Sequence, residues 1–247
     1  AAVLLSVTVA GAPPALAAVT GALSRAAAES FRMDLLVTQR NTVPGQPTIQ
    51  SPLNITGELD LKRNLGAETL SYGWRTRIVG GKAYTELPPR QAREYGTGGK
   101  AWTEEPLSAA EPPYGSAAGQ LAWDFDSDRP FNPQALLALL RSDAKVLDEG
   151  SVSGPGWTGI RYRFSVSHPA GTGGLVDSIT CTVDLDSQRH IRRLVQTTAF
   201  AAHSRHGRPG ETIYTTDFTF SDFGIRFSVT PPPASQIDLD NGVSVQF

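Results

Sequence analysis

A chain of 247 residues with 40% hydrophobic residues can bury a substantial core, in one large β-rich domain or in two small ones. Its 22 basic and 24 acidic residues give a formal net charge of -2, which excludes the basic surface that binds nucleic acid or an anionic membrane. The single cysteine, Cys181, excludes a disulfide within the chain, and its place in a patterned strand predicts a small buried side chain.

Residues 1–17 have the character of a secretory signal peptide that has lost its start. An uncharged apolar stretch leads to Ala15-Leu16-Ala17, which fits the small-x-small site of signal peptidase. The stretch is too short to span a bilayer, which needs about 20 residues. Val9-Ala10-Gly11 matches the beginning of a lipoprotein signal, but Ala12 stands where the lipid-carrying cysteine would be. We therefore expect an exported protein of the cell envelope or the extracellular space, without the cysteine that a lipid anchor needs.

Residues 18–247 are predicted to form a single domain, which begins with an Ala-rich helix over residues 18–29. The alternative is one Ala-rich helix over residues 1–30, packed on the domain. Period-two alternation then predicts a series of half-buried strands, most clearly over residues 53–62. The predicted strands are 31–40, 53–62, 68–72, 74–79, 82–87, 100–104, 144–152, 157–167, 176–185, 190–200, 211–220 and 225–229. Short turns between them predict antiparallel neighbours.

Two segments interrupt the strands. Residues 88–120 are rich in Pro and Gly and are interpreted as a rim or lid over one end of the sheet, or as a plain surface excursion. Asn132-Pro133 then caps a helix over residues 133–141, because Asn accepts from free N–H groups and Pro is tolerated in the first turn. That helix is apolar all round and must be buried. The predicted fold class is α+β: a strongly curved antiparallel β-sheet, or half-barrel, covered by one or two short helices.

No motif in the sequence indicates a particular chemistry. Asp124, Asp126 and Asp128 alternate as in a calcium loop, but the Gly and Glu of that loop are missing, and a solvated turn is favoured. His203 and His206 have no neighbouring Cys or carboxylate cluster, so no metal site is predicted. No nucleophile with a base is found, and neither a catalytic residue nor a cofactor is assigned. Among the aromatic residues, Trp74 and Trp102 could line a cavity mouth, or could belong to the core.

The order of elements resembles the LolA/LolB-like superfamily of bacterial envelope proteins, and within it the LppX/LprG-type lipoproteins of actinobacteria. The residues that carry the resemblance are Ser30-Phe31-Arg32-Met33, Gly57-Glu58-Leu59-Asp60-Leu61, Gly80-Gly81-Lys82-Ala83-Tyr84, Gly99-Lys100-Ala101-Trp102, Asn132-Pro133 and Phe218-Thr219-Phe220-Ser221-Asp222-Phe223-Gly224 with Val229 and Pro231. The resemblance covers residues 20–237. It departs from the lipidated members at Ala12, where they have the lipid-carrying cysteine.

The resemblance implies a curved half-barrel closed by helices, which holds an acyl chain or a lipidated molecule in its hollow. The implied lining is Met33, Leu35, Leu59, Leu136, Leu140, Tyr162 and Phe164. Trp74 is added as a candidate ligand-binding residue because of its place next to a Gly-rich segment. The expected partners are a lipid or acylated molecule, and a membrane surface or envelope proteins. We weigh three functions: a non-enzymatic carrier or sensor of lipid-like ligands, an envelope protein-interaction or regulatory module whose core is filled by its own side chains, and, with no supporting constellation, an enzyme.

Overall fold

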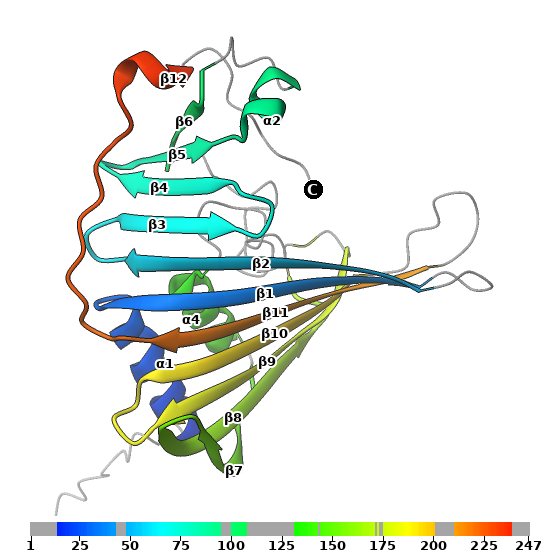
Figure 1. Cartoon of the computed structure of the whole chain (residues 1–247). Helices are drawn as coiled ribbons and strands as arrows, with labels where there is room; N and C mark the ends of the chain where they lie inside the picture. Colours follow the sequence, from blue (N-terminus) through cyan, green and yellow to red (C-terminus); the bar gives the residue numbers. More distant parts are fainter. Residues whose placement is uncertain are drawn as a thin grey trace, which may run out of the picture.

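Figure 1 shows the computed structural model of the chain, which describes residues 14–42, 48–94, 100–107, 131–142, 144–170, 172, 175–200 and 210–238. The aspartates and histidines that were considered as metal ligands lie outside these residues: Asp124, Asp126, Asp128, His203 and His206. The described part is built around a single 12-stranded sheet.

The strands of this sheet follow the order β12-β6-β5-β4-β3-β2-β1-β11-β10-β9-β8-β7. Neighbours are antiparallel, except that β12 runs parallel to β6. The strand bounds are β1 (Ser30–Thr42), β2 (Ile49–Asp60), β3 (Leu65–Leu70), β4 (Arg75–Val79), β5 (Lys82–Glu86), β6 (Trp102–Pro106), β7 (Leu147–Gly154), β8 (Trp157–Ser167), β9 (Val176–Asp186), β10 (Ile191–Phe200), β11 (Glu211–Ser221) and β12 (Ile237–Asp238).

This architecture confirms the predicted fold class. The pairing of β1 with β11 joins an N-terminal half, β1 to β6, to a C-terminal half, β7 to β11. Figure 1 shows the sheet twisting and curving from one half to the other. Within the described residues its two end strands, β7 and β12, do not pair with each other, so the sheet remains an open half-barrel.

Two helices pack on the same face of the C-terminal half, which we call the inner face. Helix α1 (Pro14–Ala26) contacts β9, β10 and helix α4 (Pro133–Ser142), as Figure 1 also shows. The four leucines of α4 are each at most 4% exposed, which confirms that this all-round apolar helix is buried: Leu136, Leu137, Leu139 and Leu140. The Asn132 side chain accepts a hydrogen bond from the Ala135 N–H at 3.0 Å, which is the predicted N-cap.

Helix α1 begins at Pro14 and ends at Ala26, whereas the sequence predicted a helix over residues 18–29. Proline is well suited to a first turn, because its missing N–H has no partner there in any case. Ala15 and Leu16 pack against the core, which explains why the helix extends into the segment assigned to the leader. The leader itself and its cleavage after Ala17 stay predictions.

The strand predicted over residues 225–229 does not form. Its segment follows β11 in the chain, but β11 already pairs with β1 on one edge and β10 on the other. With no free edge beside it, the chain runs past the ends of the strands, as the orange and red trace in Figure 1 shows, to a short 3-10 helix, η3 (Ala234–Gln236), and then β12. Along the way the Arg77 guanidinium donates to the Thr230 carbonyl at 3.2 Å.

Two further differences concern the N-terminal half. The segment 88–120 contains helix α2 (Pro89–Glu94) and strand β6, and much of its remainder lies outside the described residues. Strand β2 begins at Ile49 and includes Pro52, whereas the strand predicted from the sequence begins at Leu53. Strand β3 pairs with β2 only as far as Ile55, so Pro52 lies on a stretch of β2 with one described neighbour, where a missing N–H is tolerated.

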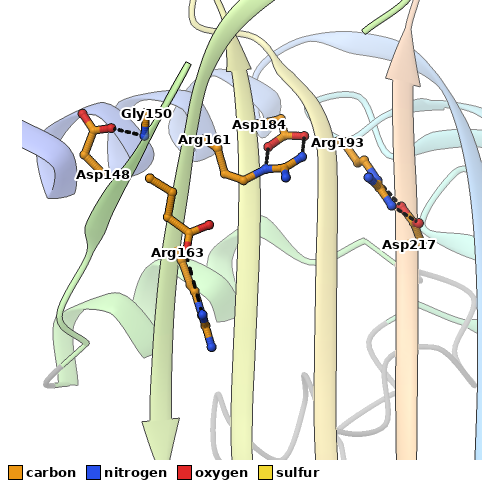
Figure 2. A network of polar contacts seen from close by, with 8 residues as sticks. Asp148, Gly150, Arg161, Arg163, Asp184, Arg193 and Asp217 are labelled. Atoms are coloured by element: carbon orange, nitrogen blue, oxygen red, sulfur yellow. Dashed lines mark hydrogen bonds and ion pairs between the residues drawn. The ribbon is translucent and has the colours of Figure 1, made fainter. Parts of the chain in front are cut away.

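The face opposite the helices, which we call the outer face, carries charge pairs across four strands of the C-terminal half (Figure 2). Arg161 on β8 binds Asp184 on β9 through two hydrogen bonds of 2.6 and 2.8 Å. Arg193 on β10 binds Asp217 on β11 at 2.8 and 2.6 Å. Bidentate pairs of this kind require a defined geometry, so they favour one strand register in addition to neutralising the two charges. Each of these four charges therefore has an opposite charge as its partner on the neighbouring strand.

Candidate functional site

All eight residues predicted to line a hollow are buried, none more than 7% exposed. Seven of them belong to one core cluster that also includes Val19 and Leu23 of α1: Met33, Leu35, Leu59, Leu136, Leu140, Tyr162 and Phe164. Trp74 lies apart from them in a small cluster with Leu87, which precedes α2, and with Ala92 of α2. Trp102 packs with Tyr84 and Ile237, under the Arg77 guanidinium. Contact with a ligand stays a prediction for all eight residues.

A pocket of about 690 Å³ lies at the edge of this core, where α1 meets the last strands of the C-terminal half. Its wall comes from the first turns of α1, from β7 and β8, and from the turn between β9 and β10. The lining residues are Pro14, Ala15, Ala18, Asp148, Ser151, Val152, Ser153, Thr158, Gly159, Ile160, Tyr162, Leu185, Asp186, Ser187 and Arg189. Tyr162 is the one predicted site residue among them, and it links the pocket to the core.

The shape of the pocket depends on a close approach of β8 to β9 at Gly159. Gly159 pairs with Asp186, and a Cβ atom at this position would lie 1.7 Å from the carbonyl oxygen of Leu185. Only glycine fits such a contact with a backbone atom. Gly159 therefore lets the end of β9, which contributes Leu185 and Asp186 to the pocket wall, lie directly against β8.

The turn between β9 and β10 is organised by the Asp186 carboxylate. Its Oδ1 atom accepts hydrogen bonds from the backbone N–H groups of Gln188 and His190, both at 2.9 Å. Its Oδ2 atom forms an ion pair with Arg192 at 3.0 Å. Asp186 is 9% exposed, so its charge is buried and satisfied by these neighbours. The carboxylate consequently builds the turn and is not available to a ligand as a free charge.

Tyr162 is a pocket residue with an ionisable side chain. Burial is the first cause that raises the pKa of its phenol, the Asp148 carboxylate raises the same pKa further, and the Arg189 guanidinium lowers it. Tyr162 is thus within electrostatic reach of two of the three charged residues of the wall, Asp148 and Arg189. Asp148 accepts a hydrogen bond from the Gly150 N–H at 2.8 Å beside a β-bulge, as Figure 2 shows.

The size and the wall of the pocket are suited to binding a small molecule. The volume falls in the range of about 300–1,000 Å³ that is usual for small-molecule pockets. Apolar side chains, such as Ile160 and Leu185, share the wall with serines and with Asp148 and Arg189. Such a mixed wall fits an amphiphile, a molecule with a hydrocarbon part and a polar part.

No group of three or more His, Cys, Asp or Glu side chains within the described ranges could hold a metal ion. Cys181 is buried, as its strand position predicted, and burial raises the pKa of its thiol far above the ordinary value. Among the helices that the structure describes, none has the length and apolar character needed to cross a membrane.

Sequence reasoning missed most of this pocket, because its wall consists of turn and strand-end residues from three separate segments. One local signal pointed to it. The stretch Asp186-Ser187-Gln188-Arg189 is a turn between two patterned strands, and turns at strand ends carry many binding residues. The contribution of the first turn of α1 was not predicted, since that turn was assigned to the leader, although the alternative of a helix over residues 1–30 included it.

No protein-family profile and no curated protein matches this chain. Solved structures with a similar fold include the lipoprotein LppX of Mycobacterium tuberculosis, with 12% identity and a TM-score of 0.46 over 89% of this chain and 100% of that chain. LprF of Mycobacterium bovis has 13% identity and a TM-score of 0.45 over 89% of this chain and 98% of that chain.

A LolA superfamily protein from Nitrosomonas europaea also matches, with 11% identity and a TM-score of 0.26 over 85% of this chain and 94% of that chain. The solved structures that match therefore include members of the group that the order of elements resembles. What this chain binds has to be argued from its own residues.

Proposed function

We propose that this chain is a non-enzymatic binding protein of the cell envelope, a carrier or sensor that holds a lipid-like amphiphile. The observation that carries the proposal is the 690 Å³ pocket with its mixed wall at the edge of an open half-barrel. The hydrocarbon part lies against Ile160, Tyr162 and Leu185, and the polar part faces the serines and charges of the wall. Export is supported by the apolar character of residues 1–17, and the proposed pocket requires that Pro14 and Ala15, which line it, remain in the mature chain.

The pocket continues into the core at two of its residues. Tyr162 and Leu185 line the pocket and also belong to the main core cluster, which includes Phe164 beyond Tyr162 on β8. A longer hydrocarbon chain would extend from the pocket past Tyr162, and would reach the predicted lining residues only by displacing side chains of α1 or α4. Binding energy comes from apolar burial, at about 0.8 kcal/mol for each methylene group.

A displacement assay tests the proposal. Saturated alkyl phosphocholines of increasing chain length compete with a fluorescent fatty acid for the purified chain. We expect the affinity to rise about fourfold with each added methylene while the chain fills the pocket, and then to level off. An affinity that does not depend on chain length would overturn the proposal.

A matched pair of variants locates the binding. Ser151 on β7 lines the pocket opposite Ile160, whereas Ser165 is an exposed serine on β8 that does not line it. Ser151→Trp should weaken binding at least tenfold, and Ser165→Trp should leave it unchanged. Equal effects of the two variants would place the amphiphile elsewhere.

A second function is favoured by the burial of the predicted lining residues. If the inner face is permanently filled by α1 and α4, the half-barrel is a scaffold for an envelope protein-interaction or regulatory module. Leu140 on α4 is 3% exposed. Under this reading Leu140→Trp strains the core and lowers the melting temperature, and no amphiphile of any chain length binds the parent chain.

A further inference from the structure

Two opposite charges flank the pocket and have no ion-pair partner among the residues that the structure describes. Asp148 is exposed on β7 and accepts one backbone hydrogen bond, and Arg189 is exposed in the turn after β9. The other carboxylate of the wall, Asp186, is already paired with Arg192. The Asp148 carboxylate and the Arg189 guanidinium do not form an ion pair with each other, although both line the pocket and both act on the pKa of Tyr162.

The backbone of Arg189 gives a separate reason to assign this residue a role. Its φ of 64° lies in the left-handed region, which costs most L-residues about 1–2 kcal/mol. The other described non-glycine residues with positive φ are Asn64, His168 and Asp222, all types that tolerate this region better. A glycine or asparagine would close the same turn with less strain. The strain is therefore consistent with a requirement for the guanidinium at the pocket.

We propose that the pocket selects amphiphiles whose polar head is zwitterionic, with the anionic group of the head on Arg189 and its cationic group on Asp148. This inference rests on the proposed function, because it names the class of ligand that the same pocket takes. The hydrocarbon part occupies the apolar wall of Ile160 and Leu185. Asp148 and Arg189 do not pair with each other, so a head group that carries both charges can bind to both side chains at once.

Charge complementarity explains the selectivity. A purely anionic head gains the attraction of Arg189 but places its charge beside Asp148, whose repulsion offsets the gain. An uncharged head leaves both side chains with water alone. Asp148 and Arg189 are both exposed, so the contact of the head group with either one contributes little more than an exposed ion pair does. Selectivity for the zwitterionic head therefore requires both contacts.

The experiment uses four soluble probes with the full chain. Dihexanoyl phosphatidylethanolamine has a zwitterionic head, dihexanoyl phosphatidylglycerol an anionic head and dihexanoylglycerol an uncharged head. Phosphoethanolamine is the zwitterionic head without its hydrocarbon chains. Isothermal titration calorimetry measures the affinity of each probe for the parent chain and for two variants, Arg189→Gln and Asp148→Asn.

We expect the parent chain to bind the zwitterionic amphiphile about tenfold more tightly than the anionic or the uncharged one. Arg189→Gln should remove this preference. Asp148→Asn keeps the oxygen that accepts from Gly150 and should reverse the order of the two charged probes, because Arg189 then acts without an opposing carboxylate. Two control variants change the same charges away from the pocket, Arg163→Gln on the outer face and Asp177→Asn at the far end of β9, and should bind like the parent.

The contradicting outcomes are distinct from one another. Equal binding of all three amphiphiles would overturn the zwitterionic selectivity and leave the proposed function standing. If no amphiphile binds, the proposed function fails as well. Phosphoethanolamine that binds as tightly as the complete amphiphile would show that the ligand is a soluble zwitterion and that the apolar wall plays no part.

Discussion

Gly159→Ala is the substitution whose cost follows most directly from the geometry. The added Cβ atom would lie 1.7 Å from the Leu185 carbonyl oxygen and 2.9 Å from the Asp186 Cα atom. Both are backbone atoms, so no side-chain rotation relieves the contact, and β8 and β9 must separate by more than an ångström. The separation breaks or weakens the ladder hydrogen bonds around the Gly159 and Asp186 pair, each with a net value of about 1 kcal/mol. With the added strain we expect a loss of about 2–4 kcal/mol.

Urea denaturation followed by tryptophan fluorescence measures this loss, and the denaturant slope shows whether unfolding stays two-state. Gly21→Ala is the control. Gly21 is exposed in α1 and a Cβ atom there would meet nothing within 4 Å, so alanine should stabilise the helix by about 0.5–1 kcal/mol. A Gly159→Ala variant as stable as the parent would refute the close approach of β8 to β9, and with it the described shape of the pocket.

Three further predictions test the surroundings of the site. Asp184→Asn should lower the free energy of unfolding, measured in urea, by about 1–3 kcal/mol. The Asp184 side chain is 3% exposed, and without its charge Arg161 faces Arg193 with no carboxylate between them. A double-mutant cycle with Arg161→Gln that shows no coupling would contradict this. Asn132→Ala should cost about 1 kcal/mol by removing the N-cap of α4, and Asn132→Asp, which can still accept the hydrogen bond, should cost less. Burial raises the pKa of the Glu105 carboxyl, so the folded chain binds the carboxyl proton more tightly than the unfolded chain does. Stability is therefore lost as the pH rises from the unfolded-state pKa through the folded-state pKa. Glu105→Gln should therefore raise the melting temperature at pH 7 and change it little at pH 4, and an unchanged difference at the two pH values would contradict the assignment.

Much of the fold could be predicted because each strand of a one-sided sheet records its buried face as a period of two. Strands β8 to β11 were found within a few residues of their bounds, and the cap at Asn132 located α4. The strand expected over residues 225–229 failed for a reason that no local pattern contains: both edges of β11 are occupied by strands from distant parts of the sequence.

The candidate site was less accessible to prediction than the fold. Apolar periodicity identifies residues that are buried, such as Phe164 and Leu59, but it does not distinguish a lining residue from a core residue. The pocket is instead defined by a glycine contact at Gly159 and by a strained turn residue, Arg189. Both depend on which strand ends come together in three dimensions, and neither leaves a periodic trace in the sequence.

Native mass spectrometry of the full chain, purified without detergent from cells that make phospholipids, tests most directly whether the pocket holds an amphiphile. We predict a stoichiometric adduct of lipid mass on the parent chain and on Ser165→Trp, and its loss on Ser151→Trp, where the new side chain fills the pocket. An apo mass for all three proteins, with no adduct after incubation with phosphatidylethanolamine, would contradict the proposed function.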